Sequence, residues 1–352
     1  MKSNSQATLK SIAEEVGVSI STVSRVLSGQ ASRYRISAAT EKAILSAAES
    51  LSFCPNPIAR SLKLNKTYTI GLLIPDIANP FFASIAQSIE REARKFQYSI
   101  ILCDSEENHE REVESIELLK NRKVDGLIVS PVGRESKHLV RIYESGIPMV
   151  TVDRYFPNSN LPFVSSDNFD GALKATNYLI SNGHRTIAFI QGLPGTSPNN
   201  DRIRGYREAH LQNNIIIDET LIVGDSFGEQ NGYVETKLLL RRTVRPTAIF
   251  AISNLISLGA LRAINEEKMN VPENISLISF DDQPYSDYLQ TPMTTVSQQN
   301  EEMGIVATKL LFDLIKTKDR SKPKSLLLPT KLIIRKSVKD ILPIGSNESR
   351  ST

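Results

Sequence analysis

The stretch VGVSISTVSRVLSG, residues 16–29, combines several hydroxyl side chains with one arginine at helical spacing. Its valines and leucine predict one buried face, and the opposite face carries Ile20, Ser21, Thr22, Ser24 and Arg25. Hydroxyls donate to phosphate oxygens or base edges, and a guanidinium can form two bonds to guanine. This face therefore suits double-stranded DNA, although an ordinary solvated helix surface has a similar composition.

The segments around this stretch predict a scaffold for it. Upstream, TLKSIAEEV carries one apolar stripe, with Thr8 expected as its N-cap and Gly17 as the residue that ends the helix. Ser19 is expected to cap the second helix, and Ser37 a third helix over ISAATEKAILSAAESL. Two short helices joined by a glycine-containing turn are typical of a helix-turn-helix unit, whose second helix enters the major groove.

The positive charge is concentrated in this part of the chain. Residues 1–66 hold nine Lys and Arg against four Glu, which gives +5, so the formal net charge of +3 leaves −2 for the remainder. Such a patch neutralises phosphates. Cys54 and Cys103 have no metal-binding spacing and fit a reducing compartment. No apolar signal core or run of about 20 apolar residues is present, so a cytoplasmic location is expected.

From Tyr68 onward, apolar runs alternate with amphipathic helical segments. The runs are apolar at both odd and even positions, as in parallel strands covered on both faces. They are YTIGLLI, YSIILC, DGLIVS, IPMVTVD, TIAFIQG, TAIFAIS and ISLISFD. The alternation predicts a doubly wound α/β architecture, duplicated as two similar lobes. Ligands of such sheets bind beyond the carboxyl ends of the strands, where this chain places Asp, Asn, Arg and Phe.

The motifs together resemble the LacI/GalR (lactose-repressor) family of bacterial transcription regulators, from about residue 8 to about residue 338. They are TLKSIAEEVGVSISTVSRVLSG, PNPIARSLK, TIGLLIPDIANPFF, VDGLIVSP, DNFDGA, NGHRTIAFI, RIRGY and VPENISLISFDDQP, in that order. The resemblance implies a homodimeric repressor with a three-helix DNA-binding domain and an α/β two-lobed, periplasmic-binding-protein-like domain. We expect residues 1–54 to form the helix-turn-helix domain, 55–66 a hinge helix or linker, 67–340 the effector-binding and dimerisation domain, and 341–352 a disordered tail.

For DNA, the resemblance implies that Ile20, Ser21 and Arg25 read bases while neighbouring hydroxyls hold phosphates. Leu62 would be an apolar wedge in the minor groove; packing against the partner's hinge is the alternative. The loop GQASRYRIS is about two residues longer than is usual in the family. The expected DNA-binding residues are Ser19, Ile20, Ser21, Thr22, Ser24, Arg25, Ser37, Asn56, Ala59, Leu62 and Lys63.

For the effector, the resemblance implies a site between the lobes. Arg202 would bind two ligand oxygens and Asp281 would accept from ligand hydroxyls, the two facing one another across the cleft; a surface ion pair is the alternative for Arg202. Leu255 stands where many members have an Asp that helps to bind polar effectors. The expected effector-binding residues are Phe81, Phe82, Asp153, Arg202, Phe227, Asn254 and Asp281.

The sequence argues against an enzyme. Its four histidines form no close pair along the chain, GLPGTS lacks the lysine of a phosphate loop, and His184 is expected to be structural. We therefore expect no cofactor, no metal and no membrane partner. The expected partners are near-palindromic operator DNA, a second copy of the chain and a small effector, a sugar or a related metabolite, which either releases or tightens the DNA. The alternatives are a periplasmic solute-binding protein and an α/β enzyme acting on a phosphosugar.

Overall fold

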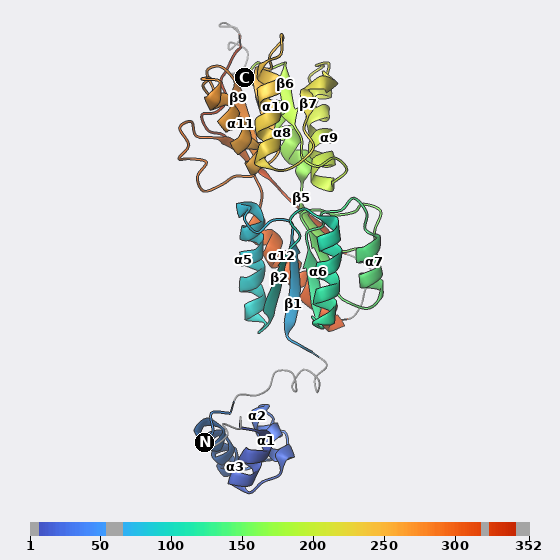
Figure 1. Cartoon of the computed structure of the whole chain (residues 1–352), viewed down its shortest axis with the longest axis vertical. Coiled ribbons are helices and arrows are strands. Elements are labelled where there is room, and N and C mark those ends of the chain that lie inside the picture. Colours follow the sequence, from blue (N-terminus) through green and yellow to red (C-terminus); the bar gives the residue numbers. More distant parts are fainter. Residues whose placement is uncertain (1–6, 54–65, 318–323, 343–352) are drawn as a thin grey trace, which may run out of the picture. The chain divides into compact units, whose positions relative to one another are not determined.

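The computed structural model describes residues 7–53, 66–317 and 324–342. The chain divides into two compact units, Met1–Thr67 and Tyr68–Thr352, and each is described here by itself (Figure 1). Among the described residues, no helix is long and apolar enough to cross a membrane.

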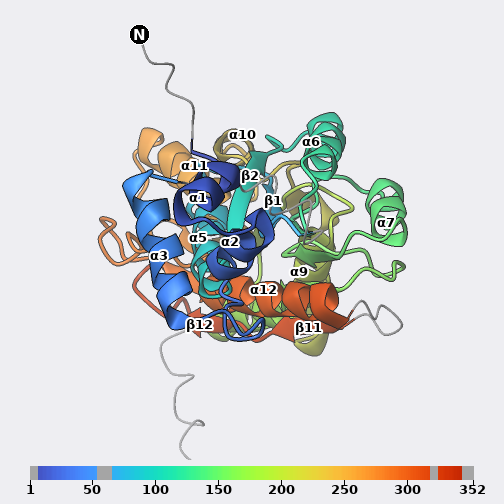
Figure 2. The same ribbon diagram turned by 90° about the horizontal axis from the view of Figure 1, so that it is seen from below.

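Within residues 7–53, the first unit contains three helices, α1 (Leu9–Val16), α2 (Ile20–Leu27) and α3 (Ala38–Ser50), which lie together in Figure 2. The expected caps are confirmed. The hydroxyls of Thr8, Ser19 and Ser37 accept from backbone amides in the first turns of the three helices, and Gly17 ends α1 with a φ of 71°. One small apolar core joins the helices; its fully buried members include Ile12, Val23 and Ile44.

The second unit contains two lobes, each built on a six-stranded sheet. The first sheet has the order β11-β5-β4-β3-β1-β2, and every neighbouring pair in it is parallel. Its strands are β1 (Thr69–Ile74), β2 (Ser99–Asp104), β3 (Gly126–Val129), β4 (Met149–Val152), β5 (Phe163–Ser166) and β11 (Ser325–Leu328). The helices of this lobe are α5 (Pro80–Lys95), α6 (His109–Asn121), α7 (Lys137–Glu144) and α12 (Asn300–Thr317).

The second sheet repeats this arrangement with the order β12-β10-β9-β8-β6-β7. Only the β10–β12 pair among the described strands of this sheet is antiparallel. Its strands are β6 (Ile187–Ile190), β7 (Ile222–Val223), β8 (Ala248–Ala251), β9 (Ser276–Phe280), β10 (Thr294–Ser297) and β12 (Lys331–Ile333). The helices are α8 (Asn168–Ser181), α9 (Ser197–Gln212), the short 3₁₀ helix η1 (Glu219–Leu221), α10 (Glu229–Leu240) and α11 (Asn254–Glu266).

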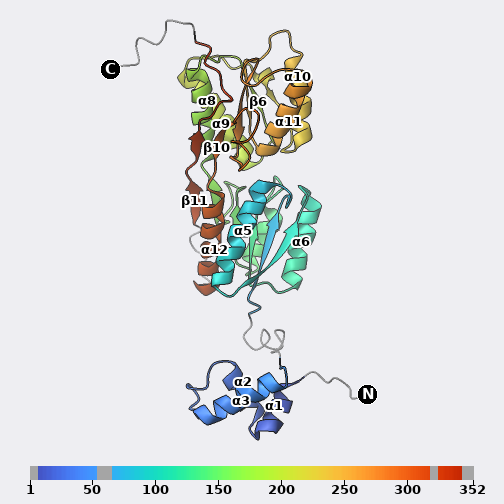
Figure 3. The same cartoon turned by 90° about the vertical axis from the view of Figure 1, so that its left-hand side faces the viewer.

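The chain passes between the lobes at three places, which Figure 3 shows side by side. These crossings lie between β5 and α8, between β10 and α12, and between β11 and β12. Because each lobe contains segments from distant parts of the sequence, neither is one continuous piece of chain. Parallel sheets place the carboxyl ends of their strands at one edge, and in both lobes those ends border the other lobe.

The structure corrects two expectations about these elements. The run YSIILC, expected to be covered on both faces, forms β2 at the edge of its sheet and is half exposed, with Leu102 at 37%. The segment 341–352 was expected to be disordered from its start. However, the backbone amide of Ile341 donates to the Asn182 carbonyl oxygen and Leu342 donates to the Asp340 carboxylate. Residues 343–352 lie outside the described part of the chain.

Candidate DNA-binding face and effector cavity

The hydroxyl groups at the start of α2 and α3 serve the helices themselves. Ser19 Oγ accepts from the Thr22 backbone amide at 3.1 Å and lies 2.8 Å from both the Ser21 and Thr22 hydroxyl oxygens. Ser37 Oγ accepts from the Thr40 amide at 3.2 Å. Because a hydroxyl has one proton and two lone pairs, the three contacts of Ser19 Oγ use its full capacity, and it has to exchange a neighbouring hydroxyl for a phosphate in order to bind one.

The side chains on the outer face of α2 are exposed to solvent, so they are free to contact DNA bases. Ile20 is 49% exposed, and Ser21 and Arg25 are also exposed. The Arg25 guanidinium stacks on the ring of Tyr34, 4.1 Å from its centroid. Tyr34 belongs to the loop GQASRYRIS, and the sequence analysis did not single it out. The hinge residues Asn56, Ala59, Leu62 and Lys63 lie outside the described residues, so their expected role stays a prediction.

A small cavity of about 30 Å³ between the two lobes brings together every residue expected to bind the effector. These residues are Phe81, Phe82, Asp153, Arg202, Phe227, Asn254 and Asp281. Five further residues line it that the sequence analysis did not include: Asn79, Arg154, Pro198, Ser253 and Gln298. Since Arg154 directly follows Asp153, the signal for it was present in the VDR segment.

Asp153 follows β4 in the first lobe and has a left-handed backbone conformation, with a φ of 61°. Its carboxylate is almost fully buried, and burial raises its pKa from 3.8 to about 6 despite the opposing charges of Arg154 and Arg202. The nearest cationic atom, Arg154 Nε, is 4.0 Å away, beyond hydrogen-bond distance. Asp153 thus offers the cavity an acceptor that the described residues satisfy only in part.

Asp281 follows β9 in the second lobe and also has a positive φ, of 72°. Burial raises its pKa, and Arg202 together with hydrogen bonds from Gln298 and the Asn254 backbone amide opposes that rise. The expectation that Arg202 and Asp281 face one another across the cleft is wrong. Arg202 lies on α9, so both side chains belong to the second lobe, and the carboxylate opposite them is that of Asp153.

Arg202 is a buried cation that both carboxylates share, rather than part of a surface ion pair. Its Nε donates to Asn168 Oδ1 at 2.8 Å, its Nη1 donates to the Ile252 carbonyl oxygen, and its guanidinium lies 3.7 Å from the centroid of Phe280. Burial lowers its pKa, while Asp281 and Asp153 act in the opposite direction. The guanidinium is therefore held in place independently of any ligand.

Several buried polar atoms around the cavity have no hydrogen-bond partner among the described residues. Arg154 Nε is a donor of this kind, and Asn254 Oδ1 and Gln298 Oε1 are acceptors. Native structures rarely leave such atoms unpaired, since each costs roughly 1–3 kcal/mol. All three residues line the cavity. A ligand with both donors and acceptors would satisfy these atoms.

Aromatic rings form the apolar part of the cavity. Phe81 and Phe82 meet edge to face, with 5.0 Å between centroids, and both are 95% buried in the core of the first lobe. Phe227 packs under Arg154, 5.0 Å from its guanidinium carbon. Gly192 permits this position, because a Cβ there would come within 2.3 Å of the Phe227 ring.

Hydrogen bonds join the two lobes at and beside the cavity: Tyr155 donates to Ser197 Oγ and to Asp201 Oδ2, each at 2.8 Å, and an asparagine pair adds another. Asn254 Nδ2 donates to Asn79 Oδ1 at 2.9 Å, and Asn79 also caps α5 by accepting from the Phe81 amide. A volume of about 30 Å³ holds one water molecule, whereas small-molecule sites span about 300–1,000 Å³. The lobes therefore have to separate before any sugar-sized molecule enters.

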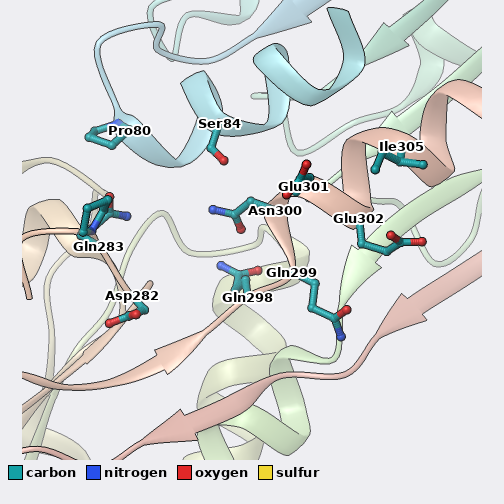
Figure 4. A pocket seen from close by; sticks show the side chains of 11 residues that line it. Pro80, Ser84, Asp282, Gln283, Gln298, Gln299, Asn300, Glu301, Glu302 and Ile305 are labelled. Carbon is teal, nitrogen blue, oxygen red and sulfur yellow. The ribbon is translucent and has the colours of Figure 1, made fainter. Parts of the chain in front are cut away.

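Two larger hollows adjoin the cavity. One of about 630 Å³, shown in Figure 4, is lined by polar residues that include Ser84, Asp282 and Glu301 and shares only Gln298 with the cavity. The other, of about 540 Å³, shares Arg154 with it. Size alone favours the polar hollow as the effector site. The buried charges and unpaired polar atoms, however, favour the small cavity between them.

The remaining expectations concern histidines and Leu255. His184 is buried between Thr247 Oγ1 and the Lys339 carbonyl oxygen, which agrees with a structural role, and Leu255 does not line the cavity. The histidines form no close pair along the chain, but the fold brings two of them together in space. His109 and His138 lie 4.8 Å apart between ring centroids, because the fold places the first turns of α6 and α7 side by side.

Comparison with known proteins agrees with both units. Residues 8–56 match the model of bacterial regulatory proteins of the lacI family, and residues 176–338 match a periplasmic binding protein-like domain. The HTH-type transcriptional repressor PurR of Histophilus somni (strain 2336) is 34% identical over 337 residues, covering 95% of this chain and 100% of the relative. The ribose operon repressor of Halalkalibacterium halodurans is 34% identical over 332 residues, covering 94% and 97%.

Solved structures show the same architecture. The Lac repressor dimer bound to operator and the anti-inducer ONPF has a TM-score of 0.84 at 24% identity, covering 95% of this chain and 100% of the other, which supports the fold alone. A complex of the transcriptional regulator CelR with cellobiose has a TM-score of 0.70 at 32% identity, covering 94% and 100%. The chain thus belongs to the lacI family of bacterial regulatory proteins and is a DNA-binding transcriptional repressor, not an enzyme.

Proposed function

We propose that this repressor reads operator bases with Ile20, Ser21 and Arg25 and binds its effector in the cavity between Asp153 and Asp281. The effector is a sugar or a related polyhydroxylated metabolite. The observation that carries the proposal is the set of unpaired buried polar atoms around the cavity, on Arg154, Asn254 and Gln298. We place the protein in the cytoplasm, where its operator lies, as a homodimer.

The DNA part of the proposal rests on the exposure and chemistry of α2. The guanidinium of Arg25 lies over the ring of Tyr34, and this contact restricts the side chain, which lowers the entropy lost when a guanidinium forms two bonds to guanine. Ile20, exposed beside it, fits the methyl group of thymine. The hydroxyls of Ser19, Thr22, Ser24 and Ser37 suit phosphates, and the basic residues of the first 66 add non-specific attraction.

The ligand part rests on complementarity between a sugar ring and the cavity. Two carboxylates accept from hydroxyl groups, the guanidinium of Arg202 and Arg154 Nε donate to ligand oxygens, and the Phe227 ring adds apolar lining for the carbon atoms of a sugar. The sequence departure at Leu255 leaves this lining intact, because that residue is not part of it.

Ligand binding controls DNA binding only if the effector has different affinities for the DNA-competent and DNA-incompetent dimers. The Asn79–Asn254 hydrogen bond and the two bonds that Tyr155 donates to Ser197 and Asp201 join the lobes in the present structure, and lobe separation breaks them. Effector binding therefore changes the separation of the two lobes. In a dimer, two copies of α2 would read half-sites about 34–36 Å apart, which predicts a near-palindromic operator.

The effector part is tested with a panel of pentoses, hexoses, disaccharides and their phosphates. Purified protein is screened for an increase in Tm, and each hit is then titrated by calorimetry against the parent and Asp281→Ala. Binding of a panel member by the parent that Asp281→Ala loses supports the site. Equal binding of the sugar by the parent and the variant would show that the sugar does not bind in this cavity.

The DNA part is tested by selecting operators from a random duplex library and measuring affinity by fluorescence anisotropy. Arg25→Ala is expected to weaken the selected sequence by about 1–3 kcal/mol and to relax preference at one base pair. Affinity should also fall steeply with salt. A solute-binding protein would select no sequence and show no such salt dependence.

The hinge residues are tested separately. If Leu62 is a wedge between base steps, Leu62→Ala keeps its effector affinity and loses most of its specific operator affinity, because the bent DNA loses its support. Unchanged operator affinity in that variant would show that Leu62 does not act as a wedge between base steps.

A further inference from the structure

Outside the effector cavity, the first lobe brings together two histidines and a glutamate. His109 and Glu112 lie three residues apart at the start of α6, so their side chains share one face of that helix. His138 is the second residue of α7. One ligand atom of each side chain lies within 4.8 Å of the other two, and none of the three residues lines the effector cavity.

The distances are those of side chains that can converge on one ion. Glu112 Oε1 is 2.7 Å from His138 Nε2 and 3.7 Å from His109 Nδ1. Zinc binds imidazole nitrogens and carboxylate oxygens at about 2.0–2.2 Å, which places tetrahedral ligand atoms about 3.4 Å apart. The Glu112–His109 separation is close to that spacing, and the Glu112–His138 separation has to widen to reach it.

The carboxylate is already oriented by the backbone of a neighbouring loop. Glu112 is fully buried, and its Oε2 accepts from the Val132 amide at 2.7 Å while Oε1 faces the histidines. Hydrogen bonds of this kind hold metal ligands in the geometry that binding needs.

The imidazole of His109 occupies space that only glycine leaves open. A Cβ at Gly133 would lie 2.7 Å from His109 Nδ1, the atom nearest to Glu112. His109 is 51% exposed and His138 18%, so an ion can enter from solvent. Glu135 interacts electrostatically with His109 and adds negative charge at this entrance.

We propose that His109, Glu112 and His138 form a binding site for a divalent first-row transition metal, with Zn²⁺ as the best-matched ion. Two imidazoles and one carboxylate suit zinc and its neighbours, whereas Mg²⁺ and Ca²⁺ prefer oxygen ligands throughout. Three protein ligands leave one position for water. The bound ion joins α6 to α7 and secures the Val132–Gly133 loop between them.

The test uses the full-length chain without a polyhistidine tag, after removal of metal with EDTA. Co²⁺ is titrated and followed by its visible absorption, which is intense for tetrahedral coordination, and Zn²⁺ is then added as a competitor. The variants are His109→Gln, His138→Gln and Glu112→Gln, with Glu110→Gln as the matched control, because Glu110 is exposed on the same helix and outside the cluster. Circular dichroism checks that each variant is folded.

We expect one equivalent of Co²⁺ per chain, displaced by Zn²⁺ and not by excess Mg²⁺ or Ca²⁺. His109→Gln and His138→Gln should each weaken binding by at least about 100-fold, and Glu110→Gln should leave it unchanged. Zn²⁺ at 100 times its Kd should raise the Tm by about 5 °C. Absence of stoichiometric binding, or equal binding by the parent and both histidine variants, overturns the proposal. Neither readout involves DNA or an effector, so the result is independent of the proposed function.

Discussion

In both lobes an aspartate directly follows the equivalent strand, but the two aspartates differ in the hydrogen bonds that they accept. β4 and β9 occupy the same position in their sheets, and each is followed by an aspartate with positive φ that lines the shared cavity. Asp281 accepts hydrogen bonds from Gln298 and Asn254, whereas the nearest cationic atom to the Asp153 carboxylate among the described residues is Arg154 Nε at 4.0 Å. The second lobe therefore presents a prepared carboxylate, and the first lobe presents one that a ligand has to complete.

Both groups have a shifted ionisation. Burial raises the pKa of both, and Arg202 opposes the rise at both. For Asp153 the pKa rises to about 6, close to physiological pH. Backbone strain and shifted pKa values both concentrate at functional sites, so the pair marks the cavity as the site where ligand binding acts.

Removing the cation that the two carboxylates share should have the largest effect. Arg202→Ala removes the hydrogen bonds to Asn168 and to the Ile252 carbonyl oxygen and a charge that favours both buried carboxylates, which is expected to lower the free energy of unfolding by about 3 kcal/mol. Urea denaturation measures this change. The matched control is Arg204→Ala on the same helix, whose exposed ion pair with Asp201 should contribute at most about 1 kcal/mol. Equal losses in the two variants would mean that Arg202 has no special role.

Substitution of the prepared carboxylate should act on the ligand. Asp281→Ala removes an acceptor and leaves Gln298 without its partner, so effector affinity is expected to fall by roughly 1–3 kcal/mol, about ten- to a hundredfold. Calorimetry with the sugar found in the panel measures it. Asp282→Asn serves as the control, because Asp282 pairs with Arg335 outside the cavity. A larger loss in the control than in Asp281→Ala would contradict the assignment.

Substitution of Asp153, unlike that of Arg202, should raise the free energy of unfolding. Raising the pKa of Asp153 from 3.8 to about 6 costs the ionised folded state roughly 3 kcal/mol at neutral pH. Asp153→Asn is therefore expected to stabilise the free protein at pH 7.5 by about 1–3 kcal/mol while it weakens effector binding. Chemical denaturation of the parent and the variant measures this gain. A loss of stability at pH 7.5 would show that the carboxylate is better satisfied than the distances indicate.

The pH dependence follows from the same group. The folded state holds the Asp153 proton between pH 4 and about 6, where the unfolded chain has lost it, so the group's contribution to stability falls as pH rises through that window. Effector hydroxyls prefer the ionised form, and affinity should be about tenfold weaker at pH 5 than at pH 7.5. Titrations at the two pH values with the parent and Asp153→Asn measure this; the same decrease in both would assign it to another group.

The sequence predicted the elements with strong patterns. The caps at Thr8, Ser19 and Ser37 follow from local hydrogen bonding, and the apolar strands from continuous runs of buried residues. β5 and β10 were missed because FVSS and TTVS are rich in hydroxyl groups, although both strands are buried. Gln298 directly follows β10, so it was missed with the strand.

Contacts between distant segments were the least predictable part. All seven expected effector residues line the cavity, because each lies where ligands of parallel sheets bind. Their distribution between the lobes, with Arg202 and Asp281 on one side, depends on the crossings of the chain. The cluster of His109 and His138 depends on how α6 and α7 pack, which no short spacing in the sequence encodes.

The most direct test of the account measures operator affinity of the parent and Asp281→Ala, with and without the sugar found in the panel. The parent should change its operator affinity when the sugar is added, and the direction of that change shows whether the sugar is an inducer or a corepressor. Asp281→Ala should have the parent's affinity for operator without sugar and should respond only at a sugar concentration about ten- to a hundredfold higher. An unchanged response in Asp281→Ala would contradict the claim that the effector binds between Asp153 and Asp281.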